Sequence, residues 1–193
     1  MNTILYLIRH GETDWNQMKR IQGHSDIHLN QTGKQQAELL ARRFARETFH
    51  VVYASDLIRA RETAQQIADL RGLSVVTLPE LRERCYGEWE GLTYEEIRQR
   101  FQERDEASCG IETFEAMQQR AVAVLTELAQ NHPGETVVVV SHGGLINSFL
   151  HYVTNGKQGT GITRIDNTSV STFRYADHRW TALRVNDTDH LEK

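Results

Sequence analysis

The sequence predicts an α/β protein with three layers: a doubly wound, mostly parallel sheet, helices on both of its faces, and antiparallel structure near the C-terminus. Two observations predict this fold class. Short apolar runs of strand length alternate with longer segments whose apolar residues recur at helical spacing, a pattern typical of a parallel sheet covered by helices. Near the C-terminus two strand-like runs instead follow each other across a short turn, which favours a hairpin.

The first half of the chain contains three predicted strands and two predicted helices. The first strand is the continuous apolar run over residues 4–8, as expected of a strand buried on both faces. Residues 32–35, Thr-Gly-Lys-Gln, have the form of a capping box, which predicts that a helix begins at Thr32. The remaining elements of this half are a strand over 51–54, a helix over 57–68 and a strand over 73–78.

The second half contains the strongest strand signal. Residues 114–128 carry apolar side chains at helical spacing. Four consecutive valines then occupy 137–140, and we call this predicted element the valine strand. It leads into a helix whose apolar residues lie between 145 and 153. The predicted hairpin pairs 169–175 with 180–185.

Length and composition fit one domain that binds neither nucleic acid nor a membrane. The chain has 193 residues and a net charge of −4, and it lacks the clustered excess of Lys and Arg that nucleic acid or an anionic membrane attracts. It shows no signal-peptide pattern, and no apolar stretch approaches the roughly 20 residues that span a bilayer. Cys85 and Cys109 form no Cys-x-x-Cys pair and are expected to be free thiols. The expected location is the cytoplasm, and both a monomer and a homodimer fit the sequence.

Residues suited to phosphate chemistry follow the ends of the predicted strands. In a doubly wound sheet, ligands bind at the carboxyl ends of the strands. Arg9 and His10 follow the first strand, and His142 follows the valine strand. Arg59 lies just inside the helix after the second strand, and Glu83 follows the third. The topology would therefore bring these five side chains to one edge of the sheet.

These residue types suit the transfer of a phosphoryl group. Arginine guanidiniums match the charge and the oxygen geometry of a phosphate monoester. A neutral imidazole is a nucleophile near pH 7, and a partly buried carboxyl group can supply the proton that a leaving alkoxide needs. Backbone N–H groups at the start of the helix after Ser141 would bind further phosphate oxygens.

Four segments carry motifs that can be compared with a known family. They are residues 7–16 (Leu-Ile-Arg-His-Gly-Glu-Thr-Asp-Trp-Asn), 55–60 (Ser-Asp-Leu-Ile-Arg-Ala), 81–91 (Leu-Arg-Glu-Arg-Cys-Tyr-Gly-Glu-Trp-Glu-Gly) and 140–144 (Val-Ser-His-Gly-Gly). In this order they resemble the phosphoglycerate-mutase-like family of histidine phosphatases, and the pattern is most similar to its short broad-specificity phosphatases. The resemblance runs over nearly the whole chain. It implies a single domain over 1–193 with a small cap segment over about 92–115.

The resemblance also implies a role for each residue at the strand ends. His10 would be the nucleophile that carries the phosphoryl group, and Glu83 would protonate the leaving oxygen. Arg9, Arg59 and His142 would bind the transferring group. Further phosphate contacts are implied for Asn16, Gln22, Gly23 and Gly143. Such a reaction depends on positioning and charge, so no cofactor and no metal are expected.

One other cluster suits a different chemistry. His24, Asp26 and His28 place two imidazoles and a carboxylate within five residues, which fits a metal ion. Nothing else nearby supplies further ligands, and the segment coincides with a loop of the family that the chain resembles. A metal site is therefore the weaker interpretation.

Three functions remain open at this point. The first is a phosphatase that hydrolyses small phosphate monoesters through phosphohistidine. The second is a mutase, but cofactor-dependent mutases carry Phe-Thr-Gly-Trp where this chain has residues 21–24, Ile-Gln-Gly-His, and have a larger insertion and a longer C-terminal tail. The third is a non-catalytic phosphate-binding regulatory module, which the complete set of expected catalytic residues disfavours. The partner is expected to be a small phosphorylated metabolite: a phosphosugar, a phosphoglycerate, phosphoserine or ribazole phosphate.

Overall fold

The computed structural model describes residues 2–101 and 105–191 and contains one six-stranded sheet in the order β3-β2-β4-β1-β5-β6. The strands are β1 (Thr3–Arg9), β2 (Val51–Ala54), β3 (Val75–Thr77), β4 (Thr136–Ser141), β5 (Val170–Ala176) and β6 (Arg179–Asp187). The pairs β2–β3, β2–β4 and β1–β4 are parallel, whereas β1–β5 and β5–β6 are antiparallel. The predicted fold class, including the antiparallel structure near the C-terminus, is confirmed.

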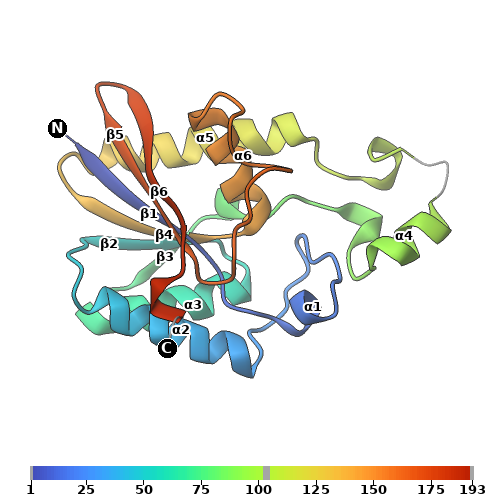
Figure 1. Ribbon diagram of the computed structural model, residues 1–193, viewed down its shortest axis with the longest axis horizontal. Helices are drawn as coiled ribbons and strands as arrows, with labels where there is room; N and C mark the ends of the chain where they lie inside the picture. The colour runs from blue at the N-terminus through green and yellow to red at the C-terminus, as the bar shows by residue number, and fades with distance from the viewer. Residues whose placement is uncertain (1, 102–104, 192–193) are drawn as a thin grey trace.

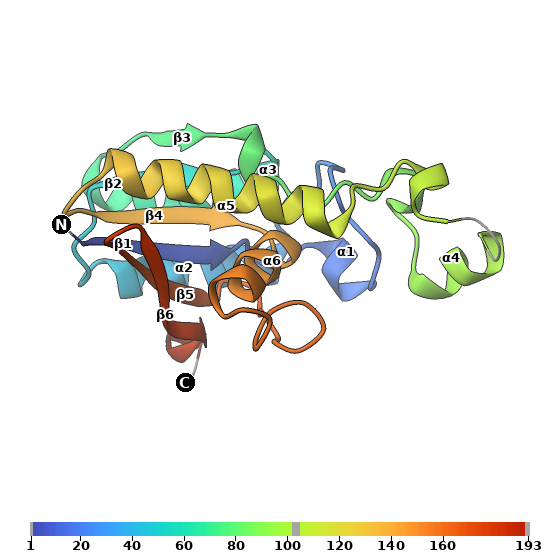
Figure 2. The ribbon, with the colours of Figure 1, turned by 90° about the horizontal axis from the view of Figure 1, so that it is seen from above.

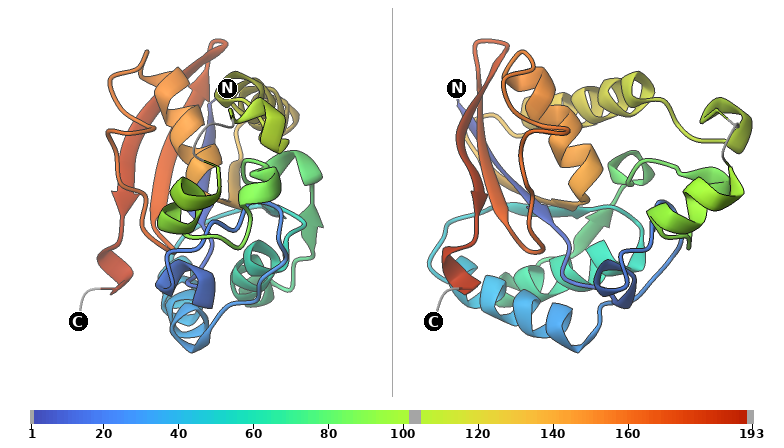
Figure 3. Two further views of the ribbon diagram at one scale, coloured as in Figure 1. Left: turned by 90° about the vertical axis from the view of Figure 1, so that its right-hand side faces the viewer. Right: turned by 45° about the vertical axis from the view of Figure 1, so that its right-hand side comes forward.

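Helices cover both faces of this sheet, as Figure 1 and the two views of Figure 3 show. The α-helices are α1 (Asp14–Gln17), α2 (Gln31–Phe44), α3 (Ile58–Ala68), α4 (Tyr94–Arg100), α5 (Phe114–Asn131) and α6 (Gly143–Val153). Single 3₁₀ turns are η1 (Asp69–Arg71), η2 (Pro79–Leu81), η3 (Gly87–Trp89), η4 (Ala107–Cys109) and η5 (Asp189–Leu191). Helices α2 and α3 pack on one face, and α5 and α6 pack on the other.

The central strand β4 shows why its sequence is continuously apolar. Val137 and Val139 belong to the core beneath α5 and α6, whereas Val138 and Val140 belong to the core beneath α2 and α3. All four valines are fully buried. Because neighbouring side chains on a strand point to opposite faces, a strand with helices on both sides needs an apolar residue at every position.

Several predicted boundaries differ from the structure, among them the start of α2 and the extent of β3. Helix α2 begins at Gln31 rather than at Thr32, because Asn30 is the N-cap and its Oδ1 accepts a hydrogen bond from the N–H of Gly33 at 2.8 Å. The Asn30 side chain is in turn held by Glu12, 2.9 Å away, a contact outside the local pattern. The third strand is shorter than predicted and covers only 75–77.

The segment 92–115 extends away from the sheet and contains α4 and η4 (Figures 1 and 2). Positions 102–104 of the predicted cap lie outside the described residues. The inner end of the segment joins the loop after α1: the N–H of Ile21 donates to the Leu92 carbonyl at 2.9 Å, and the N–H of Gly91 donates to the Ile21 carbonyl at 2.8 Å. Within the part of the chain that the structure describes, no helix has the length and apolar character needed to cross a bilayer.

Candidate active site

A pocket of about 380 Å³ opens where β1 ends, next to the loop after α1 and the start of α3. Its lining residues are Arg9, His10, Trp15, Asn16, Lys19, Arg20, Ile21, Gln22, Gly23, Arg59, Glu83, Tyr86 and Tyr94. Seven residues that the sequence predicted for a phosphate site are among them. Of these seven, Arg9, His10, Arg59 and Glu83 come from segments at or after the ends of parallel strands. Their side chains line one pocket, as the strand-end rule predicts.

His10 lies at the bottom of this pocket and is 3% exposed. Its Nδ1 is 2.7 Å from the carbonyl oxygen of Gly11. A carbonyl can only accept, so Nδ1 carries the proton and Nε2 keeps a lone pair. The pKa of His10 is well below its usual value, because burial and then the charges of Arg59 and Arg9 disfavour the imidazolium. A neutral ring whose Nε2 carries the lone pair is the nucleophilic form, and here that lone pair accepts from Nε of Arg59 at 3.3 Å.

Two buried guanidiniums flank this ring. Arg59 is 1% exposed; its Nε lies 3.3 Å from Nε2 of His10, and its Nη2 donates to the Gly23 carbonyl at 2.8 Å. Burial lowers the pKa of Arg59 to about 10, which leaves it charged at neutral pH. Arg9 donates from Nη1 to the Ile165 carbonyl at 2.6 Å, while its buried Nε has no partner among the described residues. The site therefore holds positive charge and at least one unused donor.

His142 and Gly143 lie behind the pocket rather than in its lining. The His142 ring is fully buried, its centroid is 5.2 Å from that of His10, and neither ring nitrogen has a hydrogen-bond partner in residues 2–101 and 105–191. Burial, followed by the charge of Arg59, lowers its pKa well below the usual value. Gly143 is the first residue of α6, and a Cβ there would lie 3.4 Å from Nε of Arg9. His142 thus lies beside His10, and Gly143 beside Arg9, without lining the pocket themselves.

Glu83 is held at the start of α6. Its Oε2 accepts a hydrogen bond from the N–H of Gly144 at 2.9 Å, and its Oε1 accepts one from the N–H of Arg84 at 2.8 Å. Any side chain at 144 would displace it, because a Cβ would come within 2.3 Å of Oε1. Arg120 on α5 braces the same loop by donating to the carbonyls of Glu80 and Arg82 at 2.7 and 2.8 Å. The carboxylate consequently has a defined position beside the pocket.

The loop after α1 contributes the remaining predicted residues. Asn16 and Gln22 both line the pocket. Gly23 has φ of +49°, and a Cβ would lie 2.2 Å from Oε1 of Glu90. That carboxylate accepts hydrogen bonds from the N–H of His24 at 2.9 Å and from the Ser25 hydroxyl at 2.8 Å. Only glycine fits at this point, where the loop closes around Glu90.

His24, Asp26 and His28, the weaker interpretation as a metal site, each contact a different partner. His24 Nε2 is 2.8 Å from the Glu83 carbonyl, and Asp26 Oδ1 accepts from the N–H of Ile58. His28 pairs instead with Glu62 at 2.7 Å. In residues 2–101 and 105–191, His, Cys, Asp and Glu side chains form no group of three or more that could hold a metal ion.

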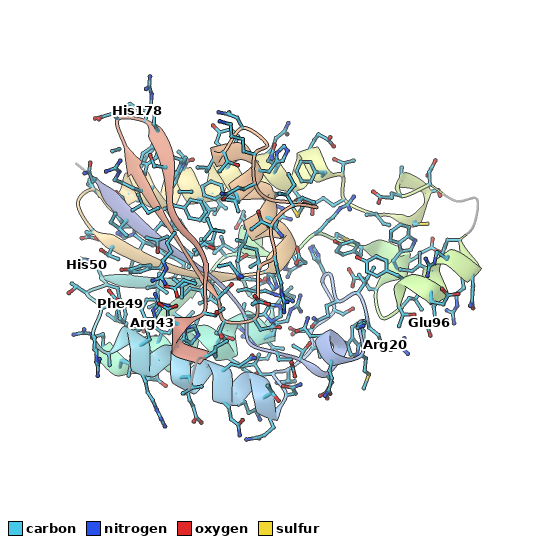
Figure 4. The ribbon with its side chains drawn as sticks, in the orientation of Figure 1. Arg20, Arg43, Phe49, His50, Glu96 and His178 are labelled. Atoms are coloured by element: carbon cyan, nitrogen blue, oxygen red, sulfur yellow. The ribbon has the colours of Figure 1, made fainter. Side chains whose placement is uncertain are left out.

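The segment 92–115 contributes Tyr94 to the pocket lining. It also contacts Arg20 of the loop after α1, which lines the same pocket. Arg20 Nη1 donates to the Gly91 carbonyl at 2.7 Å and to Oε2 of Glu96 at 2.8 Å. Figure 4 shows Arg20 and Glu96 close together between the loop after α1 and α4. This contact fixes one wall of the pocket.

Comparison with known proteins agrees with this geometry. The model of the histidine phosphatase superfamily (branch 1) matches residues 5–188. The chain belongs to the histidine phosphatase superfamily. The prediction of this family is therefore confirmed, and with it the class of phosphomonoester hydrolases.

Three relatives of this histidine phosphatase span nearly its whole length. Phosphoglycerate mutase-like protein 4 from Arabidopsis thaliana is 39% identical over 98% of this chain and 87% of its own. The structure of YhfR from Bacillus stearothermophilus is 30% identical, has a TM-score of 0.90, and aligns over 98% of this chain and 100% of its own. A mutant of phosphoserine phosphatase from Entamoeba histolytica, in complex with phosphoserine, is 30% identical with a TM-score of 0.84 over 98% and 100% of the two chains.

Residues outside the four motifs also shape the site of this histidine phosphatase. The N–H of Gly11 donates to Oγ1 of Thr63 at 3.0 Å, and the Thr63 hydroxyl donates to the Arg59 carbonyl at 2.8 Å. Arg120 and the segment 165–169 were not predicted to take part. The helical spacing around Arg120 indicates only a surface position, so no signal in the sequence identifies its role.

Proposed function

We propose that this histidine phosphatase hydrolyses small-molecule phosphate monoesters through a covalent phosphohistidine at Nε2 of His10. The observation that carries the proposal is the state of the His10 ring. It is buried and neutral, its Nδ1–H donates to Gly11, and its Nε2 faces the guanidinium of Arg59. A phosphorus atom bound beside that guanidinium would meet a lone pair at close range.

In the first step Nε2 of His10 attacks phosphorus, and the bond between phosphorus and the ester oxygen breaks. Glu83, which lines the same pocket, gives its proton to the leaving oxygen, so the product is an alcohol and not an alkoxide. The Nδ1–H bond to the Gly11 carbonyl persists and stabilises the positive charge that develops on the ring.

In the second step a water oxygen attacks phosphorus and the N–P bond breaks. The Glu83 carboxylate takes the proton from that water, and inorganic phosphate leaves with His10 neutral again. Arg9 and Arg59 offset the phosphate charge in both steps, and the unpartnered nitrogens of His142 supply a further contact. Every charge that the reaction develops is met by a group of the chain, so we propose that no metal or cofactor takes part.

We propose that the segment 92–115 is the cap of a single domain and that it selects the substrate. The phosphate contacts come from the sheet edge, whereas the outer pocket is lined by Tyr94 of α4 and by Arg20, which α4 holds through Glu96. The partner is a small phosphorylated metabolite. A cytoplasmic location and a state of one or two copies stay predictions of the sequence.

A mutase is the second candidate, because the relative from Arabidopsis thaliana that is 39% identical carries a mutase-like name. A mutase must keep water away from phosphohistidine. The loop residues Gln22 and Gly23 line an open pocket here, which supports water as the acceptor. We therefore propose hydrolysis and treat isomerisation as the alternative that the experiment must distinguish.

The experiment uses 3-phosphoglycerate, phosphoserine and p-nitrophenyl phosphate with the purified chain, with and without EDTA. Free phosphate should accumulate much faster than 2-phosphoglycerate, and chelation should leave the rate unchanged. Rapid isomerisation that depends on a bisphosphate primer would establish a mutase. Loss of activity in EDTA that a divalent metal restores would require a metal role, with His24, Asp26 and His28 as the first candidates.

A further inference from the structure

The segment 165–169, between α6 and β5, lies against the residues that follow β1. The N–H of Thr168 donates to the carbonyls of Arg9 and His10 at 3.0 and 3.3 Å, and the N–H of Arg9 donates to the Ser169 carbonyl at 3.2 Å. The Arg9 guanidinium donates to the Ile165 carbonyl at 2.6 Å. Both the main chain and the side chain of Arg9 are thus fixed by one segment that none of the four motifs contains.

Asn167 in this segment makes two contacts with a single amide nitrogen. Its Nδ2 lies 3.0 Å from the carbonyl oxygen of His10 and 3.3 Å from Oδ1 of Asn16. An amide nitrogen has two hydrogens, so both bonds form at once. The His10 carbonyl can only accept, which requires that the nitrogen and not the oxygen of Asn167 faces it.

The hydrogen-bond partners of Asn16 likewise define which end of its side-chain amide is the oxygen. Its Oδ1 receives the N–H of Thr13 at 3.1 Å, in addition to Nδ2 of Asn167. A backbone N–H can only donate, so the atom at this position has to be the oxygen. The NH₂ group of Asn16 is then the end left for a substrate in the pocket that this residue lines. A donor aimed at a phosphate oxygen is the useful orientation, since the oxygen of a reversed amide would repel the phosphate.

Residues near the C-terminus hold the segment in an unusual conformation. Thr168 has φ of +55°, which is a genuine outlier for a β-branched residue. Asn186 binds Asp166 twice, accepting from its N–H at 2.7 Å and donating to its Oδ2 at 2.9 Å. His190 Nε2 lies 3.2 Å from Oγ1 of Thr168. Strain of this kind persists where the surrounding contacts over-determine the backbone, as they do beside this site.

We propose that Asn167 is a positioning residue of the active site. Its side-chain amide holds the main chain of His10 and, together with the N–H of Thr13, keeps Oδ1 of Asn16 turned away so that the NH₂ of Asn16 is left for the phosphate. It acts through these two residues and does not touch the substrate. The inference rests on the proposed function, because it assigns the same pocket to a phosphate.

The test compares Asn167→Ala and Asn167→Asp with the wild-type chain. Asn167→Ala removes both donors, and kcat/KM should fall roughly tenfold to a hundredfold, as small misplacements of reacting groups do. Asn167→Asp is nearly isosteric but replaces the donor by an acceptor that faces two acceptors, so its loss should be larger. Arg164→Ala is the matched control, because it removes the ion pair between the exposed Arg164 side chain and Asp166 and leaves both contacts of Asn167 in place. It should stay within about twofold of wild type, as is usual for surface pairs.

A double-mutant cycle separates positioning from a general structural effect. In an Asn16→Ala background, Asn167→Ala should cost several-fold less than it does in the wild type, because part of its effect passes through Asn16. Thermal unfolding of each variant shows whether it is folded. Equal losses in the two backgrounds, or a folded Asn167→Ala variant within about twofold of wild type, would overturn the inference.

Binding of inorganic phosphate, measured by calorimetry, keeps the inference separate from the proposed function. Asn167→Ala should weaken phosphate binding several-fold, and Arg164→Ala should not. If wild type hydrolysed no phosphate ester but bound phosphate with this dependence, the proposed function would fail and the positioning role would stand. If wild type turned over and neither its phosphate affinity nor its kcat/KM depended on position 167, only the positioning role would fail.

Discussion

The edge of the sheet and the segment 92–115 are built in opposite ways, although both line the same pocket. At the sheet edge, Arg59, His10 and His142 are almost completely buried. In the segment, Arg98 and Glu95 pair while about three quarters and three fifths of their side chains are exposed (75% and 62%). A buried guanidinium such as that of Arg59 needs fixed hydrogen-bond partners. An exposed ion pair contributes little to stability and can be replaced.

This difference teaches where a histidine phosphatase of this kind can vary. The groups proposed to bind the phosphate are held by backbone groups: Arg9 and Arg59 donate to carbonyls, and Glu83 accepts from the N–H of Gly144. The outer wall rests on a few contacts, chiefly those of Arg20 with Gly91 and Glu96. Substitutions at the sheet edge should therefore affect the chemical step, and those in the segment should affect the choice of substrate.

The largest effect is expected for His10→Ala. Without Nε2 no covalent intermediate forms, and turnover should fall at least about a thousandfold. Acid-labile label from a radioactive phosphate ester should appear on wild type alone. His178→Ala, at the exposed turn between β5 and β6, is the control and should label normally (Figure 4). Label on a serine or an aspartate would contradict the assignment of His10.

Glu83→Gln should have the next largest effect and should depend on the leaving group. An alkoxide needs a proton to leave, so the variant should lose roughly a hundredfold on alkyl phosphates, the usual contribution of a general acid. Nitrophenolate leaves as the anion, so the burst of nitrophenol from p-nitrophenyl phosphate should lose much less. The burst has to be compared because the proposed mechanism also uses Glu83 to take the proton from water in the second step. Equal burst losses with both substrates would restrict Glu83 to shaping the site.

Acid should destabilise the fold through the buried histidines of the sheet edge. The folded pKa values of His10 and His142 lie well below the unfolded value of about 6.5, chiefly because of burial. Below that pH the unfolded chain binds protons that the folded chain does not, so stability is complete above pH 6.5 and falls as the pH decreases. Stability should therefore be lower at pH 5 than at pH 7.5.

Urea unfolding at the two pH values measures this loss. His142→Asn should reduce the difference between them, whereas His178→Asn, which changes an exposed side chain, should not. An unchanged difference in His142→Asn would show that this ring does not stay neutral in the folded state. His190 should add a loss in the same direction that ends near its folded pKa of about 4, which burial lowers.

The smallest effect is expected for Arg20→Ala, which tests the outer wall. It removes a partly exposed ion pair with Glu96 and a hydrogen bond to the Gly91 carbonyl, and exposed pairs contribute little. KM should rise by no more than roughly tenfold, while the burst rate at saturating substrate should stay close to wild type. Arg98→Ala is the matched control and should change neither value. A large fall in the burst rate would place Arg20 in the chemical step.

Local sequence patterns predicted most of the fold. Continuous apolar runs such as 137–140 indicate strands buried on both faces, because a parallel sheet with two helical layers exposes neither side. The wrong start of α2 came from the same kind of reasoning: Thr32 fits a local capping box, but Asn30 is the N-cap and its side chain is held by Glu12, which lies outside the local pattern.

The sequence by itself determined the identity of the family and the residue types at the strand ends, since motifs and periodicity are properties of neighbours along the chain. Local partners, the Gly11 carbonyl and the Thr13 N–H, orient the His10 ring and the Asn16 amide. Only the tertiary structure decided which distant residues brace the two side chains. Asn167 and Asn16 are 151 positions apart, and Arg120 meets the carbonyls near Glu83 from a helix that the local pattern indicates only as amphipathic. The topology of the fold brings such distant residues together, and no local sequence pattern encodes these contacts.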